Sequence, residues 1–338
     1  MAIHRLTVLG VGGTISMTGT ADGLYPTRSA SQVLGDAAGD HNETIIEARD
    51  FRRKPSASLS YEDVTELARM IDQCAAEGAT GIIVTQGTDT MEETSFAIEL
   101  LSQAALPIVF TGAMRGASMP GHDGPRNLAD AIHVARYLAG QDTVLVVMNG
   151  QAHAARRVMK MHTTALEAFA SPGTGPVMTI LEDLVCQHAE IPGPRIRIPV
   201  ENLADPLPRV AIVTIGLGDD GQLLGLLPSS LHKGCILAAL GAGHVPETMM
   251  PDIESLAGAM PVILASRINA GPVLERTYGY RGSETDLMKR GVLTSGWLGA
   301  PKARILLTLT LAAYGPEAGA HFSRIADALT PQLHKTPP

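Results

Sequence analysis

Two hydrophobic patterns alternate along the first half of the chain. Short continuous aliphatic runs, which are typical of buried strands, occur at residues 6–9, 81–85, 107–111 and 144–148. Between them, apolar residues at every third or fourth position predict helices over residues 61–74, 90–101 and 126–138. This alternation predicts βαβ units on a mostly parallel sheet.

A second, shorter series of the same kind follows near the C-terminus. Its strands are expected at 210–215, 236–240 and 261–265, and its helix at 302–313. Residues 191–209 contain five prolines, so we expect no regular element there.

The two series predict an α/β protein of two domains. A larger N-terminal domain, 1–190, carries a doubly wound, mostly parallel sheet; residues 191–209 form a linker; and residues 210–338 form a smaller C-terminal α/β domain. The length of 338 residues, too large for one ordinary core, favours the same division.

Charge and hydropathy exclude two classes of partner. The net charge is −8 and the densest basic cluster is only Arg52-Arg53-Lys54, so we expect no binding to nucleic acid. The longest apolar stretch, near 305–313, is interrupted by threonines and is too short to cross a membrane.

Cysteine usage and the first residues indicate the compartment. The three cysteines, Cys74, Cys186 and Cys235, are widely spaced and form no C-x-x-C pair, which favours free thiols in a reducing compartment. The apolar run at residues 6–9 is too short for a secretory leader, so we predict a cytoplasmic location.

Two hydroxyl-rich loops follow predicted strands, where functional groups of open parallel sheets gather. The first is Gly12-Gly13-Thr14-Ile15-Ser16. It begins like a dinucleotide fingerprint, but Ile15 stands at the third glycine, and no P-loop lysine is present in the chain. A tight turn that needs glycine backbone angles remains the alternative to a functional loop.

The second loop is Thr85-Gln86-Gly87-Thr88-Asp89-Thr90. Thr90 and Glu93 have capping-box spacing, so a purely structural interpretation makes Thr90 a helix cap with Glu93 reciprocating. That interpretation leaves Thr88 and Asp89 without a role, and from the residues alone the structural and functional interpretations stay equally open.

Both loops resemble the signature motifs of a known family. Gly12-Gly13-Thr14-Ile15 and Gly87-Thr88-Asp89-Thr90-Met91-Glu92-Glu93-Thr94 are similar to the two motifs of the bacterial-type L-asparaginases, the asparaginase/glutaminase family. Further similar segments follow in the family's order, namely Gly112-Ala113-Met114-Arg115, Asp123-Gly124-Pro125-Arg126-Asn127-Leu128 and Lys302-Ala303-Arg304. The resemblance spans nearly the whole chain. It implies two α/β domains, no cofactor and a homodimer or homotetramer.

Catalytic roles follow from the resemblance by position. Thr14 matches the nucleophile, and Tyr25 matches a tyrosine in a mobile flap that accepts or relays the threonine proton. Thr88, Asp89 and Lys160 match a second constellation, in which Lys160 acts as a base. Asp89 then anchors the substrate ammonium and orients Lys160.

Substrate-binding roles are implied for Ser56, which matches the residue that holds the substrate α-carboxylate, and for Glu284. Glu284 matches a glutamate that reaches the active site of the neighbouring subunit, the alternative being a solvated loop carboxylate. The chain departs from the family at Ala57, where relatives often carry a polar residue. It departs again at His244, which stands in a segment that is asparagine-containing in some relatives and either contributes to binding or only fills a turn.

The resemblance implies hydrolysis of L-asparagine to L-aspartate and ammonia through an ester on Thr14. The alternatives are a glutaminase-asparaginase, an ammonia-supplying amidase subunit and a non-catalytic asparagine sensor. We expect an amidase subunit to carry an appended domain, and a sensor has no need of two activated hydroxyls. The eleven histidines show no H-E-x-x-H spacing, so we expect neither a metal nor a cofactor.

Overall fold

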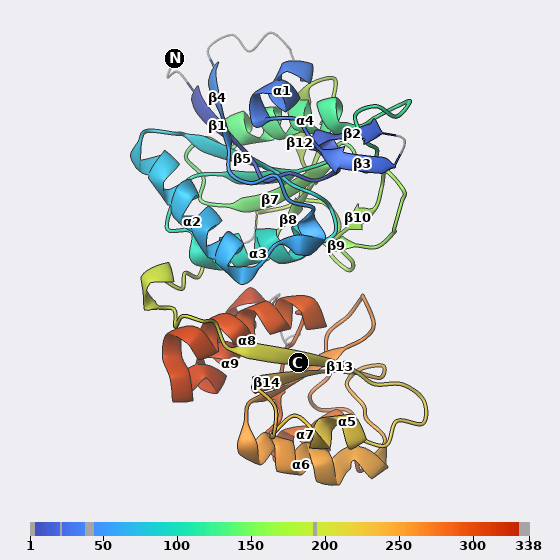
Figure 1. Ribbon diagram of the computed structural model, residues 1–338. Coiled ribbons are helices and arrows are strands. Elements are labelled where there is room, and N and C mark those ends of the chain that lie inside the picture. Colours follow the sequence, from blue (N-terminus) through green and yellow to red (C-terminus); the bar gives the residue numbers. More distant parts are fainter. Residues whose placement is uncertain (1–3, 21, 38–43, 192–194, 331–338) are drawn as a thin grey trace, which may run out of the picture. The chain divides into compact units, whose positions relative to one another are not determined.

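A computed structural model describes residues 4–20, 22–37, 44–191 and 195–330. The chain divides into two compact units, Met1–Val200 and Glu201–Pro338 (Figure 1). The predicted α/β class, with a large mostly parallel sheet and a smaller C-terminal domain, is confirmed. The predicted domain limits at 190 and 210 stay a prediction.

The described part of the large unit contains an eight-stranded sheet in the order β12-β11-β8-β7-β6-β5-β1-β4. Five strands are mutually parallel: β1 (His4–Gly10), β4 (Thr44–Asp50), β5 (Gly81–Thr85), β6 (Ile108–Thr111) and β7 (Val144–Met148). The remaining three join antiparallel: β8 (Gln151–Ala154), β11 (Met178–Leu181) and β12 (Leu184–Gln187). The central strands are aliphatic because helices cover both of their faces.

Helices cover the two faces of this sheet in pairs. On one face lie α1 (Ala30–Asp36) and α4 (Gly124–Tyr137), and on the other lie α2 (Tyr61–Ala76) and α3 (Met91–Leu101) (Figure 1). The local sequence sets the start of α2, since the Ser60 side chain and Asp63 form a reciprocal capping box.

Two small hairpins stand apart from the large sheet. One pairs β2 (Met17–Thr20) with β3 (Gly23–Pro26), and the other pairs β9 (Met159–Lys160) with β10 (Phe169–Ala170). Both hairpins carry residues that the sequence assigns to the site.

The described part of the second unit contains four parallel strands in the order β13-β14-β15-β16. They are β13 (Arg209–Thr214), β14 (His232–Ala239), β15 (Val262–Ser266) and β16 (Leu293–Thr294). In Figure 1, α8 (Ala300–Tyr314) and α9 (Ala318–Leu329) lie on one side of this sheet, and α5 (Gln222–Gly225), α6 (Met250–Ala259) and α7 (Glu284–Lys289) on the other. Among the described residues, every helix falls short of the length and apolarity that a bilayer crossing requires.

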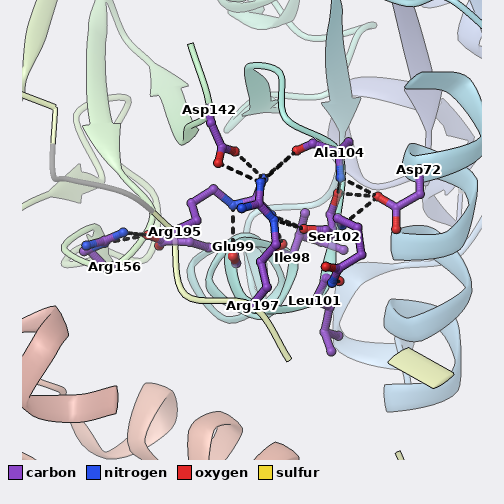
Figure 2. A network of polar contacts seen from close by, with 11 residues as sticks. Asp72, Ile98, Glu99, Leu101, Ser102, Ala104, Asp142, Arg156, Arg195 and Arg197 are labelled. Atoms are coloured by element: carbon purple, nitrogen blue, oxygen red, sulfur yellow. Dashed lines mark hydrogen bonds and ion pairs between the residues drawn. The ribbon is translucent and has the colours of Figure 1, made fainter. Parts of the chain in front are cut away.

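The proline-rich segment is bound to the large unit over its first described residues. The buried Arg195 guanidinium donates to carbonyl oxygens at the end of α3, including those of Glu99 and Ser102, and pairs with Asp142 at 3.0 Å (Figure 2). These bonds satisfy carbonyls that a helix end leaves without partners. The expectation of no regular element in this segment is not fully met: residues Val200–Asn202 form a single 3₁₀ turn, and β13 begins at Arg209.

Candidate active site

The loops after β1 and β5 touch backbone to backbone at two glycines. A Cβ atom on Gly13 would lie 2.1 Å from the Gly87 nitrogen, and Gly13 has a φ of +85°. A Cβ atom added to Gly87 would in turn lie 2.6 Å from Ser56 Oγ. Only glycine fits both places, and the contacts bring the segments of Thr14, Ser56 and Thr88 together.

Thr14 opens a short 3₁₀ turn whose other two residues are buried. The Ser16 hydroxyl and N–H both donate to the Gly13 carbonyl, at 2.8 and 2.9 Å. Ile15 packs so closely against Gly124 that a Cβ there would lie 2.9 Å from Ile15 Cγ1. Thr14 therefore stays partly exposed on a tight turn that is fixed from both sides.

The glycine contact predicts a large effect from one added methyl group. We expect Gly13→Ala to lower the free energy of unfolding by about 1–3 kcal/mol from its positive φ, with about 1–3 kcal/mol more from overpacking against Gly87. Gly78→Ala is the matched control, because Gly78 has a φ of +97° and no described atom within 4 Å of the added carbon. Denaturant unfolding of both variants measures the difference. Equal losses of unfolding free energy in the two variants would show that the loops after β1 and β5 move apart without a free-energy penalty.

The structure brings Thr88, Asp89 and Lys160 together. Lys160 Nζ donates to Thr88 Oγ1 and to Asp89 Oδ1, each at 2.9 Å. The Lys160 side chain is 17% exposed whereas that of Asp89 is 63% exposed. An ion pair with so exposed a partner contributes little to stability, so its consequence is the orientation of the ammonium group. The second carboxylate oxygen of Asp89, Oδ2, lies 3.5 Å from Ser56 Oγ.

Ser56 is buried and bonded to the same loop. Its Oγ accepts the Asp89 N–H at 3.1 Å and lies 3.5 Å from Asp89 Oδ2. Its carbonyl oxygen accepts the Thr90 hydroxyl at 3.0 Å. Ser56 therefore fixes the position of Asp89, while the next residue, Ala57, is exposed.

The same bonds correct the structural interpretation of Thr90. Thr90 is the N-cap residue of α3, but its side chain makes no capping hydrogen bond, so the expected capping box with Glu93 does not form. The reason is that the Thr90 hydroxyl is bound to the Ser56 carbonyl and lies 3.3 Å from Gln86 Nε2. Thr90 joins two loops instead of closing the helix end.

Tyr25 lies on the β2–β3 hairpin opposite Thr18 and is half exposed. The hairpin is held to the loop after β6, because Gly19 N–H donates to Ser118 Oγ at 3.0 Å and Ala117 N–H to the Met17 carbonyl at 3.1 Å. Strand β3, which carries Tyr25, packs against the 3₁₀ turn that Thr14 opens, although among the described residues no hydrogen bond joins the Tyr25 hydroxyl to Thr14.

The loop after β6 is itself fixed by two of the motif residues. The Asp123 carboxylate accepts the N–H groups of Met114 and Arg115, and Asn127 Nδ2 donates to the Gly112 carbonyl at 3.0 Å. These two motif residues therefore hold the loop in position.

Glu284 lies in the second unit and is fully buried at the start of α7. Its Oε1 accepts the N–H groups of Thr277 and Tyr278, and its Oε2 lies 3.4 Å from His244 Nε2. Burial raises the pKa of Glu284, but the backbone hydrogen bonds and His244 outweigh it, so that the pKa falls below its usual range. Glu284 is thus no solvated loop carboxylate, and His244 does more than fill a turn: it packs edge-on against Tyr278 and Tyr280.

A metal centre is not evident in the described ranges: no group of three or more His, Cys, Asp or Glu side chains there could hold an ion.

Comparison with known proteins gives matches to both units. The family model described as Asparaginase, N-terminal, matches residues 5–191, and that of the Glutaminase/Asparaginase C-terminal domain matches residues 209–319. A probable L-asparaginase of Deinococcus radiodurans is 36% identical over 92% of this chain and 94% of its own length.

Two further relatives come from different sources. A component of the glutamyl-tRNA(Gln) amidotransferase of Methanosarcina mazei is 31% identical over 86% of this chain, and the match spans 70% of that component. The crystal structure of a probable cytoplasmic L-asparaginase from Campylobacter jejuni has a TM-score of 0.83 at 27% identity, covering 94% of this chain and 99% of that one.

Proposed function

Because this chain belongs to the asparaginase family of amidohydrolases, we propose that it hydrolyses L-asparagine to L-aspartate and ammonia. The observation that carries the proposal is the Lys160 ammonium, 2.9 Å from both Thr88 Oγ1 and Asp89 Oδ1 beside the Thr14 turn. A hydroxyl bonded to a lysine that a carboxylate orients is an arrangement for activating an oxygen nucleophile.

In the proposed reaction the Thr14 hydroxyl attacks the side-chain amide carbon of the substrate. Because a threonine hydroxyl is a weak nucleophile, its proton passes to a base, for which Tyr25 is the candidate. The oxyanion forms against backbone N–H groups and the Thr88 region. The leaving nitrogen takes the proton back from that base and departs as ammonia, so that a β-aspartyl ester remains on Thr14. A water activated by Thr88, Lys160 and Asp89 then hydrolyses that ester.

Substrate binding is proposed for Ser56 and Asp89. Asp89 Oδ1 holds Lys160, which leaves its other oxygen for the substrate ammonium. Ser56 Oγ accepts the Asp89 N–H, and its own proton can turn toward the substrate α-carboxylate.

The test is ammonia release from L-asparagine and from L-glutamine by the purified protein. Ammonia from asparagine at catalytic rates supports the proposal. Binding of asparagine without ammonia release would indicate a sensor, and release only with an added acceptor complex would indicate an ammonia-supplying component like the Methanosarcina relative.

We expect a preference for asparagine over glutamine. Glutamine is one methylene longer, so its amide passes Thr14 unless the α-groups move, and one methylene commonly changes kcat/KM by about 10–200-fold. Ala57 removes a polar side chain that could hold a displaced α-group. Steady-state kinetics with both amides measures the ratio, and equal kcat/KM values would contradict the preference.

The active unit is proposed to be at least a homodimer, in which Glu284 with His244 completes the partner's site near the substrate ammonium. A two-fold axis would form two such sites together. We expect a mixture of Thr14→Ala and Glu284→Gln chains, each inactive alone, to regain activity on subunit exchange. Random mixing makes half of the dimers mixed, and each mixed dimer has one intact site out of two. About a quarter of wild-type activity is therefore expected. Glutamine is chosen because it keeps an acceptor for the Thr277 and Tyr278 N–H groups.

The control mixture combines Thr14→Ala with Thr88→Val. Each of these changes damages the site of the chain that carries it. Both sites of a mixed dimer are therefore damaged, and no activity should return. If mass measurement shows that mixed dimers form and the Glu284 mixture stays inactive, the shared site is wrong.

A cytoplasmic location is proposed as well. It is supported by three cysteines without disulfides, of which Cys74 and Cys235 are buried and Cys186 is exposed. Cell fractionation followed by an immunoblot checks this.

A further inference from the structure

One continuous segment of the chain binds both the ammonium group and the main-chain N–H of Lys160. The ammonium group donates to Thr88 and Asp89, while the main-chain N–H of Lys160 donates to Glu92 Oε2 at 2.5 Å. Residues 88–92 lead from the loop after β5 into the first turn of α3. The residues that accept the Lys160 ammonium and the carboxylate that accepts the Lys160 main-chain N–H therefore lie on the same continuous stretch of chain, residues 88–92.

The regular strand pairing around Lys160 is short. Strand β9 is only two residues long and pairs with β10 in a sheet of its own, outside the large sheet. A main-chain bond from Met161 N–H to the Ala168 carbonyl at 2.7 Å continues this hairpin, and on the other side Val158 N–H donates to the Ala154 carbonyl at 2.9 Å. A two-residue strand gives weak positional control, so a side chain that binds its N–H matters more here than in a wide sheet.

Glu92 is well placed to supply that control. Helix α3 is buried along most of its length, and its far end is bound by Arg195 (Figure 2). A carboxylate that accepts a main-chain N–H forms a charge-assisted bond, stronger than a bond between neutral groups. The bond fixes where the flexible four-carbon stem of Lys160 begins.

We propose that Glu92 is a positioning residue for the reaction: by binding the Lys160 main-chain N–H, it fixes the distance from the Lys160 ammonium to Thr88 Oγ1. The inference rests on the proposed amidase function. A base must lie within hydrogen-bond reach of the group it serves, and a shift of about 1 Å can lower a rate by about 100-fold. Glu92 touches no reacting atom in this scheme and acts through Lys160.

Glu92→Ala and Glu92→Gln test the proposal with the purified full chain. Alanine removes the acceptor, so we expect kcat for the preferred amide to fall by about 10–100-fold, with KM within about twofold. Glutamine keeps a carbonyl oxygen that accepts the same N–H, so its kcat should stay within about threefold of wild type. Equal losses in the two variants, a rise in KM at unchanged kcat, or an unchanged Glu92→Ala enzyme would each overturn the proposal.

A matched control separates positioning from stability. Asp72 Oδ1 accepts the main-chain N–H groups of Gln103 and Ala104 just beyond the other end of α3 (Figure 2). We expect Asp72→Ala to lower the melting temperature while leaving kcat unchanged, because Asp72 has no link to Lys160. If kcat follows the melting temperature in both alanine variants, Glu92 is only structural.

A double-mutant cycle with Lys160→Ala gives the sharpest outcome. If Glu92 acts through Lys160, Glu92→Ala lowers kcat no further in a chain that already lacks the lysine. A full further loss in that background would overturn the proposal. A wild-type protein that releases no ammonia from any amide would instead refute the proposed function, and the two failures are thus distinguishable.

Discussion

Replacing Thr14 with alanine is expected to lower kcat by about a thousandfold or more, as removal of a nucleophile does in other acyl-transfer enzymes. The change removes one methyl group and the hydroxyl to which the proposed reaction assigns the ester, both from a partly exposed turn. Because Gly13, Ile15 and Ser16 hold that turn, the fold should persist and the substrate should still bind. Stopped ammonia assays and calorimetric binding of asparagine measure the two effects.

Thr14→Ser is the control, since serine keeps a hydroxyl at the same place and should retain far more activity than alanine. A Thr14→Ala enzyme that kept more than about a tenth of wild-type kcat would show that another group attacks the amide.

Replacing Thr88 with valine is expected to lower kcat by about 10²–10⁴-fold, the range that general acid–base groups contribute. Valine keeps the volume of threonine but removes the oxygen that accepts the Lys160 ammonium at 2.9 Å. The Lys160 ammonium then loses its bond to Thr88 and keeps its bond to Asp89. Single-turnover kinetics should show ester hydrolysis slowed more than ester formation.

Thr85→Val, three residues earlier in β5, is the matched control for Thr88→Val. Thr85 is buried, and within the described part of the chain its hydroxyl makes only a long 3.5 Å contact with the Leu9 carbonyl. Its loss should therefore leave kcat within about twofold. Comparable losses from the two valine variants would mean that Thr88 matters for packing alone.

The central strands could be predicted from the sequence because helices bury both of their faces. Strands β5 and β7 begin and end where their aliphatic runs do. Strand β4 escaped prediction because it lies at the edge of the sheet, where Glu47 and Arg49 interrupt the pattern. Helices α6 and α9 were also missed, although Ile253 and Leu256, and Phe322 and Ile325, have the three-residue spacing of a buried helix face.

Local chemistry explains what could be predicted of the site. Thr14 and Thr88 follow parallel strands whose carboxyl ends meet, so sequence position marks their loops as candidates, but only the family resemblance assigns the two threonines a role. Lys160 lies far away along the chain on a two-residue strand, and only the family resemblance pointed to it. Glu92 was missed because an acidic residue in the first turn of a helix is ordinarily explained by the helix dipole.

Arg195 has a consequence for anyone who wishes to produce the large unit as a separate fragment. A fragment that stopped at residue 190 would lose this guanidinium, and the carbonyls of Ser102 and Ala104 would lose the donor that it supplies. Each buried polar group orphaned in this way destabilises a fold by about 1–3 kcal/mol. The first residues of the proline-rich segment thus belong to the folding unit that precedes them, and a practical cloning boundary lies beyond Arg197, whose guanidinium also pairs with Asp142.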